Sequence, residues 1–274
     1  MGRFFGNKNF TAGFILTSIV VIAALISMIW TPYDGNKMNA RARLQGPSIS
    51  HPLGTDQYGR DTLSRVMVGA VNSIIVGLVT VVMGLLVGVF LGLASAYYGR
   101  WVDESIMRFS NLLFGFPAVL SAILITSILG PSMINAMLAI GIFYIPIFAR
   151  LTRAVSITIW EREFIAAARA SGVSEWAITW RHVLPNILSP LLIQGTIQFA
   201  VAILAEAGLS FLGVGIAAPT AAWGSMVSTG YAYLTTNPIL SFAPGLAIML
   251  TVFSFNMVGD GLRDALDPRL RGTI

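Results

Sequence analysis

The stretch WEREFIAAARASGVSEWAITWRHVLPN, residues 160–186, is a charged island between long apolar runs, and it decides how the chain is organised. It is rich in residues that favour helices, and apolar segments long enough to cross a membrane precede and follow it. Charged residues are costly inside a bilayer, so such an island is expected on one side of it. We therefore interpret it as a surface on which a soluble partner docks.

The composition is that of a membrane protein. Of the 274 residues 55% are hydrophobic and 11% are charged, and the mean hydropathy is +0.77. Soluble domains carry roughly 25% charged residues, so this chain has less than half the usual charge. The net charge of +5 does not indicate nucleic-acid binding, because the basic residues lie in short clusters beside apolar runs. The chain has no cysteine and only two distant histidines, His51 and His182, so we expect no metal and no cofactor.

Six apolar segments predict an all-α polytopic membrane protein with six transmembrane helices. The first segment ends in Trp30-Thr31-Pro32 without a small-residue cleavage site, so we interpret it as a retained anchor rather than a signal peptide. Pro117 is expected to bend the third segment. The segments are 10–30, 66–98, 109–129, 133–149, 187–205 and 239–259.

The basic residues predict the orientation. After residue 66, all ten Lys and Arg side chains fall at 100–108, 150–181 or 263–271. By the positive-inside rule these three clusters are cytoplasmic, and six spans then place both termini inside. We expect the first cluster, at 100–108, to form a short polar turn. The predicted parts are 1–31, the cytoplasmic N-terminus and anchor helix; 32–65, an extracytoplasmic segment despite its five basic residues; 66–259, the transmembrane domain with loop 160–186; and 260–274, a cytoplasmic tail.

Small residues recur about every four positions along segment 66–98. Small side chains at this spacing let another helix approach closely within lipid. We expect them to form one packing face inside this protein. They are Gly69, Ser73, Gly77, Gly84, Gly88, Gly92 and Ala96.

The segment HPLGTDQYGRDTLSR, residues 51–65, contains His51, Asp56 and Asp61, which are residue types found in catalytic and metal sites. A catalytic or metal site is therefore one interpretation. The other is a folded cap, in which Asp and Thr side chains terminate turns and begin the next helix. We favour the cap.

Within the island the sequence predicts two helices separated by a glycine. Four alanines favour a first helix over residues 161–171, and Gly172 suits a left-handed residue after it. Ser174 can cap a second short helix, which Leu184 and Pro185 end, because proline suits the first turn of the next membrane helix. A smooth alanine face with charged edges favours partner docking, although an ordinary pair of interfacial amphipathic helices also fits.

The island resembles the coupling loop of ABC importer permeases, whose pattern is E-A-A-x3-G-x9-I-x-L-P. Two positions depart from it, because Ala166 stands at the pattern's glutamate and His182 at its isoleucine. Glu163 is near that glutamate but does not occupy its position. The resemblance implies that the island couples to an ATPase through Glu163, Ala167, Ala168, Gly172, Leu184 and Pro185.

Three further stretches resemble the smaller, C-type permease subunit of dipeptide, oligopeptide and nickel importers. They are HPLGTDQYGRDTLSR (51–65), AEAGLSFLGVGIAAPTAAWGSM (205–226) and FNMVGDGLRDALDPRL (255–270). With the island, they extend the resemblance from about residue 50 to the end of the chain. It implies a type I ABC importer permease, with an anchor helix and a five-helix core, that provides half of a substrate pathway in the bacterial cytoplasmic (inner) membrane.

The resemblance also implies partners: a second permease subunit, two ATP-binding cassette ATPases and an extracytoplasmic substrate-binding protein, besides the lipid bilayer. The two lysines, Lys8 and Lys37, do not close a G-x4-G-K-[ST] phosphate loop, so we expect ATP hydrolysis on a partner and no enzymatic activity here. Peptides are the expected substrate. Nickel chelates, opines and glutathione-like peptides use similar permeases and stay open as alternatives.

Glu206 is the one Asp, Glu, Lys or Arg between Arg181 and Asp260, and it falls at the end of a predicted span. An acid in a membrane span is a functional candidate. It could contact substrate, lie near the outer end of its helix, or be hydrogen-bonded within the bundle. Its place in the A-E-A-G-L-S-F-L-G motif of the resembled family implies a structural or gating role, which we favour.

Two other classes of function fit parts of the sequence. An intramembrane protease is excluded, because no histidine or lysine inside a span could activate Ser210 and no second aspartate accompanies Asp260 in a span. A self-contained secondary transporter or channel fits the composition. Such proteins usually carry inverted repeats and mid-membrane polar groups, whereas we find no clear repeat here and only Glu206 charged in a predicted span.

Overall fold

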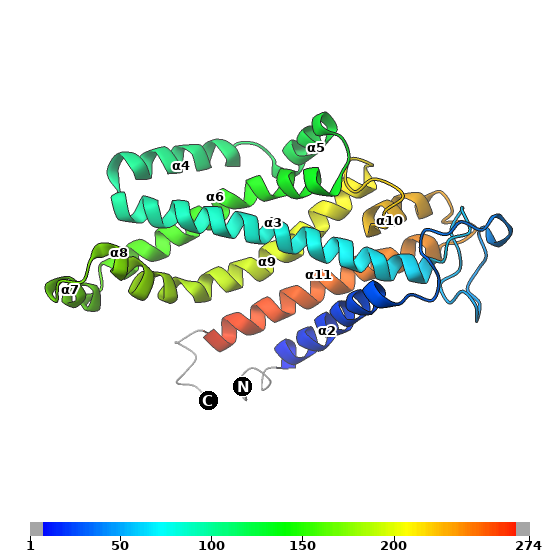
Figure 1. Cartoon of the computed structure of the whole chain (residues 1–274), viewed down its shortest axis with the longest axis horizontal. Coiled ribbons are helices and arrows are strands. Elements are labelled where there is room, and N and C mark those ends of the chain that lie inside the picture. Colours follow the sequence, from blue (N-terminus) through cyan, green and yellow to red (C-terminus); the bar gives the residue numbers. More distant parts are fainter. Residues whose placement is uncertain (1–7, 267–274) are drawn as a thin grey trace.

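The computed structural model describes residues 8–266, and within this range every regular element is a helix (Figure 1). The long helices lie roughly along one axis, as in a membrane bundle. Predictions for residues 1–7 and 267–274 lie outside the described residues. In chain order the elements are α2 (Lys8–Ile29), η1 (Ala40–Ala42), α3 (Thr62–Tyr98), α4 (Arg100–Phe114), α5 (Ala118–Leu129), α6 (Met133–Trp160), α7 (Glu163–Ala170), α8 (Glu175–Ile178), the π-helical η2 (Thr179–Val183), α9 (Leu184–Phe211), α10 (Trp223–Tyr231) and α11 (Ile239–Leu266).

Five helices within residues 8–266 are long and apolar enough to cross a membrane: α2, α3, α6, the helix from Glu175 to Phe211, and α11. A sixth crossing exists if α4 and α5 count as one broken span. The predicted all-α polytopic fold is therefore confirmed. Helices α6 and α11 run past their predicted ends, to Trp160 and Leu266.

The segment predicted as a span at 109–129 is not one continuous helix, and the break lies at Pro117, where a bend was expected. The chain bends by 82° between α4 and α5. Pro117 has no amide hydrogen and disfavours helical backbone at Phe116, and Gly115 is a weak helix former, so the helix stops here. The expected polar turn is wrong, because Arg100 begins α4 and the charged residues placed in that turn lie on this helix.

The predicted small residues of α3 do pack inside the protein, but against more than one helix: Gly84, Gly88 and Gly92 contact α6, whereas those nearer the start of α3 face α9 and α10. A Cβ atom added at Gly84 would lie 2.5 Å from Cβ of Tyr144, and one at Gly88 would lie 2.6 Å from Cβ of Phe148. Gly92 continues the same face toward α6. Any larger side chain along this line would push the two helices apart.

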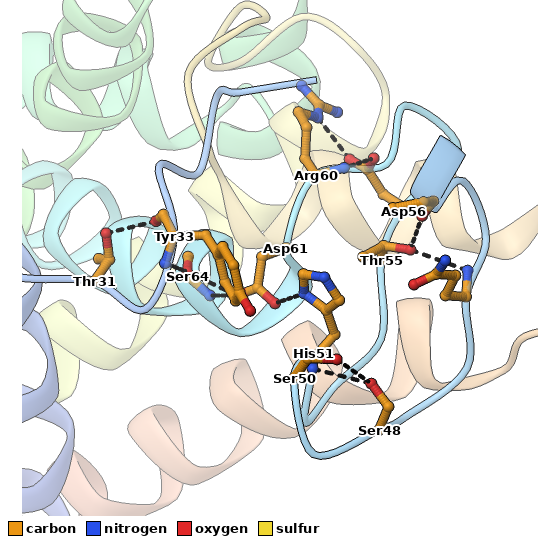
Figure 2. Close-up of polar contacts among 12 residues, drawn as sticks. Thr31, Tyr33, Ser48, Ser50, His51, Thr55, Asp56, Arg60, Asp61 and Ser64 are labelled. Atoms are coloured by element: carbon orange, nitrogen blue, oxygen red, sulfur yellow. Dashed lines mark hydrogen bonds and ion pairs between the residues drawn. The ribbon is translucent and has the colours of Figure 1, made fainter. Parts of the chain in front are cut away.

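The segment before α3 forms a folded cap at one end of the bundle, as predicted (Figures 1 and 2). Asp61 begins α3, and its Oδ2 accepts a hydrogen bond of 2.8 Å from the Ser64 N–H. His51 Nδ1 lies 2.9 Å from Oδ1 of Asp61, and Asp56 accepts a bond of 2.6 Å from Arg60 Nε. These side chains therefore terminate turns and begin a helix. No group of three or more His, Cys, Asp or Glu that could hold a metal ion occurs within residues 8–266.

The prediction that the second helix of the island ends at Leu184 and Pro185 is wrong. Helix α8, η2 and α9 follow one another without interruption, so one helix runs from Glu175 to Phe211. Pro185 lies in the first turn of α9, as expected, and its missing amide hydrogen removes one helical bond. One residue before the proline, the Leu184 N–H bonds to the Thr179 carbonyl, five residues back. This wider, π-helical turn lets the helix continue through Pro185.

Candidate functional site

The charged island lies at the opposite end of the bundle from the cap, beyond the ends of the long helices (Figure 1). Helix α6 leads into it, and the continuous helix from α8 to α9 leads out of it. We call its outward-facing residues the α7–α8 surface. They are Glu163, Phe164, Ala167, Gly172, Trp176, Trp180 and Pro185, all of which are exposed.

Local backbone chemistry sets the shape of this surface. Gly172 has a φ of +75°, and its N–H bonds to the Arg169 carbonyl at 2.9 Å. The N–H of Val173 reaches the Ala168 carbonyl at 3.1 Å, which completes the left-handed helix ending that the sequence predicts. Ser174 then caps α8, as predicted, by accepting a bond of 3.4 Å from the backbone N–H three residues later.

Four aliphatic side chains anchor the island to the bundle. Ile165 of α7 and Ile178 of α8 have no exposed surface, and both belong to the main hydrophobic core. Val183 and Ile187 continue that buried line into α9. The α7–α8 surface is therefore continuous with the membrane helices, rather than a loop that moves independently of them.

The sequence-predicted coupling residues divide into two groups. Glu163, Ala167, Gly172 and Pro185 are exposed and are available to a partner. The other two are half-buried and pack against the core, so they support the surface from behind. These two are Ala168 and Leu184.

Two tryptophans on this surface were missed by the sequence reasoning. Trp176 is 70% exposed and Trp180 is 47% exposed, and their rings meet edge to face at 5.5 Å. Phe164 on α7 adds a third exposed aromatic ring. The four-residue spacing of the tryptophans on a helix signals a shared face. Exposed aromatic side chains grouped in this way mark protein interaction sites.

An ion pair holds the two short helices of the island together. Arg169 of α7 donates from Nε to Glu175 Oε1 of α8 at 2.8 Å. The guanidinium also lies over the ring of Trp160, 5.1 Å from its centroid, at the end of α6. One exposed arginine thereby links three helices at the base of the α7–α8 surface.

Glu206 lies far from this surface, toward the other end of α9, and it is completely buried. Its Oε2 accepts a bond of 3.1 Å from Ser73 on α3, and its Oε1 accepts one of 2.6 Å from Ser210. Ser210 Oγ in turn accepts a bond of 3.0 Å from the Ile216 N–H. Of the roles open at the sequence level, this geometry matches a carboxylate hydrogen-bonded within the bundle.

Comparison with known proteins places this chain among bacterial transport permeases. Residues 84–272 match the family described as binding-protein-dependent transport system inner membrane component. The chain is 44% identical over 265 residues to the dipeptide transport system permease protein DppC of Alkalihalophilus pseudofirmus, and the match covers 97% of this chain and 87% of that protein.

Two other relatives have different names. A putative peptide transport system permease protein of Brucella abortus is 42% identical, over 98% of this chain and 90% of its own length. The glutathione transport system permease protein GsiD of Pectobacterium atrosepticum is 38% identical, with the same coverage. Among solved structures, an inward-facing MetNI methionine ABC transporter has a similar fold, with a TM-score of 0.59 over 73% of this chain and 95% of that chain at 18% identity.

Proposed function

Since the chain belongs to the family of binding-protein-dependent transport system inner membrane components, in which it is a type I ABC importer permease, we propose that it couples the hydrolysis of ATP on a separate subunit to the uptake of peptides. Residues 66–259 would form the permease domain and half of the translocation pathway. The observation that carries the coupling role is the group of exposed aromatic and small side chains on the α7–α8 surface. It continues without a break into the helix from Glu175 to Phe211, and a short turn at residues 161–162 connects it to α6.

A peptide is the substrate that the relatives favour. Their names specify dipeptides, peptides and glutathione, which is itself a peptide. Nickel chelates and opines remain alternatives that uptake assays with each ligand would distinguish. A second permease, two ATPases and an extracytoplasmic binding protein complete the proposed importer.

The proposed orientation places the α7–α8 surface in the cytoplasm and the cap outside. The three basic clusters after residue 66 support it through the positive-inside rule. The N-terminal half of α2 packs against the C-terminal half of α11, since Phe10 lies directly against Gly261. Both termini would then be cytoplasmic.

An alanine-to-arginine pair tests the coupling role. Ala167→Arg puts a long charged side chain on the exposed face of α7, whereas Ala40→Arg makes the same change on the exposed cap. In a reconstituted transporter we expect Ala167→Arg to lower two quantities at least ten-fold: the amount of ATPase that co-purifies with the permease, and the rate of ATP-driven uptake. Ala40→Arg should leave ATPase co-purification unchanged. Normal coupled uptake by Ala167→Arg would refute the docking role, and uptake by this chain without any ATPase would favour a secondary transporter.

A further inference from the structure

A small polar cavity lies at the cap end of the bundle, where the cap meets α3, α10 and α11. Its volume is about 40 Å³. A water-sized group needs about 10–15 Å³ of such space, so the cavity has room for about three heavy atoms. The polar side chains that line it include Asp56, Arg60, Thr62 and Arg65 on one side and Ser225 and Thr229 of α10 on the other.

Two buried arginines line this cavity and share a single acid. Arg60 is 7% exposed and Arg65 is 5% exposed. Arg60 Nε donates to Oδ2 of Asp56 at 2.6 Å (Figure 2), whereas Arg65 Nε lies 3.9 Å from the same oxygen. No other acid among residues 8–266 pairs with either arginine. The three side chains therefore leave one positive charge in excess.

The shared acid is already engaged by its own turn. Asp56 Oδ1 accepts the backbone N–H of Tyr58 at 2.8 Å and that of Arg60 at 3.0 Å. The hydrogen bonds of Arg65 all go to neutral oxygens. Its Nη1 donates to the Gly35 carbonyl at 2.9 Å, to Asn36 Oδ1 at 3.3 Å and to the Pro219 carbonyl at 3.4 Å. A buried charge is costly unless an opposite charge lies close to it, so the cavity favours an anion.

Thr62 gives a second, independent indication of a ligand. It lines the cavity and is 1% exposed, and its Oγ1 has no hydrogen-bond partner among residues 8–266. A buried hydroxyl normally has a partner, because leaving it unsatisfied costs free energy. The hydroxyls of Ser225 and Thr229 differ, since each donates to a backbone carbonyl three or four residues earlier. Thr62 therefore has a hydrogen-bond donor left over.

A carboxylate matches the size and the chemistry of the cavity. Its three heavy atoms correspond to the available room, and its two oxygens accept hydrogen bonds from guanidinium and hydroxyl groups. A cation would be repelled by the arginines, and an apolar group would leave the Thr62 hydroxyl unpaired. Water alone could pair with the hydroxyl, but it would leave the excess charge in place.

We propose that this cavity binds a single carboxylate group, held by Arg60, Arg65 and the Thr62 hydroxyl. The site goes beyond the proposed transport function, since it does not depend on which substrate is carried. In the proposed orientation the cavity faces the outside, so the carboxylate would come from there. A free small carboxylate and an acidic side chain of the binding protein offer the same chemistry. In either case, the bound group would fasten the cap to α3.

Thermal unfolding of the assembled transporter in sodium acetate, compared with sodium chloride at equal ionic strength, tests the site. At ten times its dissociation constant, acetate should raise the melting temperature of the wild type by about 3 °C. Arg60→Gln should abolish this rise. Arg41→Gln removes an exposed charge of the cap outside the cavity and should keep it. No rise in the wild type, or an equal rise in Arg60→Gln, would overturn the proposal.

Thr62→Val is a second variant, which nearly preserves the side-chain volume and removes only the hydroxyl. In chloride it should melt no lower than the wild type, because it removes an unpaired buried group. In acetate it should bind at least three-fold more weakly than the wild type, because one hydrogen bond to the carboxylate is lost. A lower melting temperature in chloride, or an unchanged affinity for acetate, would contradict the assignment.

The affinity of the binding protein for the transporter distinguishes the two sources. If its side chain supplies the carboxylate, then acetate and Arg60→Gln should each weaken its binding at least ten-fold. If a free carboxylate occupies the site, then both should leave that binding unchanged while acetate still stabilises the wild type. Either result supports the site and identifies its ligand. The acetate measurements contain no peptide, so a transporter that takes up no peptide would refute the proposed substrate and leave the site standing.

Discussion

Ser73 on α3 donates a hydrogen bond of 3.1 Å to Oε2 of Glu206 on α9, and neither residue has exposed surface. The other carboxylate oxygen accepts from Ser210, which also receives the N–H of Ile216 in the loop after α9. A single acidic side chain therefore fixes two membrane helices and a loop relative to one another. This arrangement supports a structural role for Glu206.

We predict that Glu206→Ala destabilises the protein by about 2–4 kcal/mol, because it leaves a cavity and deprives two buried serine hydroxyls of their acceptor. Glu206→Gln keeps the volume and one acceptor oxygen, so it should lose about 1 kcal/mol. Thermal unfolding of the purified complex measures both. Glu206→Gln should also transport with unchanged substrate selectivity. A changed selectivity with normal assembly would instead indicate contact with substrate.

Gly88→Ala should disrupt the α3–α6 contact. The added Cβ would lie 2.6 Å from the Ile145 carbonyl oxygen and from Cβ of Phe148, and a close-packed interface cannot absorb that without shifting backbone. We expect a loss of about 1–3 kcal/mol in stability. Gly195→Ala on α9 is the matched control, since its nearest neighbour would be 3.9 Å away at Val81. Equal melting temperatures for the two variants would contradict the packing argument.

Gly172→Val should impair coupling through the backbone alone. No atom lies within 4 Å of the added Cβ, but the φ of +75° costs a residue with a branched side chain about 1–2 kcal/mol. Gly172→Asn introduces a side chain that tolerates this conformation and should retain coupled uptake. The measurement is peptide-stimulated ATP hydrolysis alongside uptake. If both variants are equally impaired, then close approach of a partner, rather than backbone geometry, requires the glycine.

Trp176→Ala should weaken binding of the ATPase. Exposed tryptophans that become buried at an interface commonly contribute about 2 kcal/mol or more, which corresponds to roughly thirty-fold in Kd. Trp180→Ala should have a smaller effect, because that ring is less exposed. Titration of the permease complex with fluorescent ATPase measures the affinity. Tyr231→Ala removes an equally exposed ring on α10 and should leave ATPase affinity unchanged.

The location of five membrane helices could be predicted, because length and absence of charge are properties of each segment alone. The small-residue face of α3 and the left-handed conformation of Gly172 could also be predicted, because both depend on residues that are close together in the sequence. The 82° bend between α4 and α5 was not, although Pro117 indicated a bend. Its size depends on how α4 lies against α6, where Arg153 pairs with Asp103 across 50 positions of sequence.

The continuity of α8 with α9 was also missed, because Pro185 normally ends a preceding helix and the widened turn before it leaves no sequence signal that we recognise. The tryptophan pair was overlooked for a different reason. The island was interpreted through its alanines and charges, whereas Trp176 and Trp180 become informative only once both are found on an exposed face. Contacts between distant segments, such as Ser73 with Glu206, lay beyond what local patterns predict.

The uninterrupted helix from Glu175 to Phe211 has a mechanical consequence. Its two ends stand in different compartments of the proposed importer, and Glu206 lies 31 residues, or about 46 Å, from Glu175 along the axis. If this helix moves as a rigid lever, then a tilt of about 10° at the ATPase end displaces the Glu206 end by roughly 8 Å, which exceeds one helical pitch of about 5.4 Å. The π-helical turn η2 is where such a helix would bend most easily. The stiffness of this turn would therefore determine how much of each ATPase movement is transmitted to the far side of the membrane.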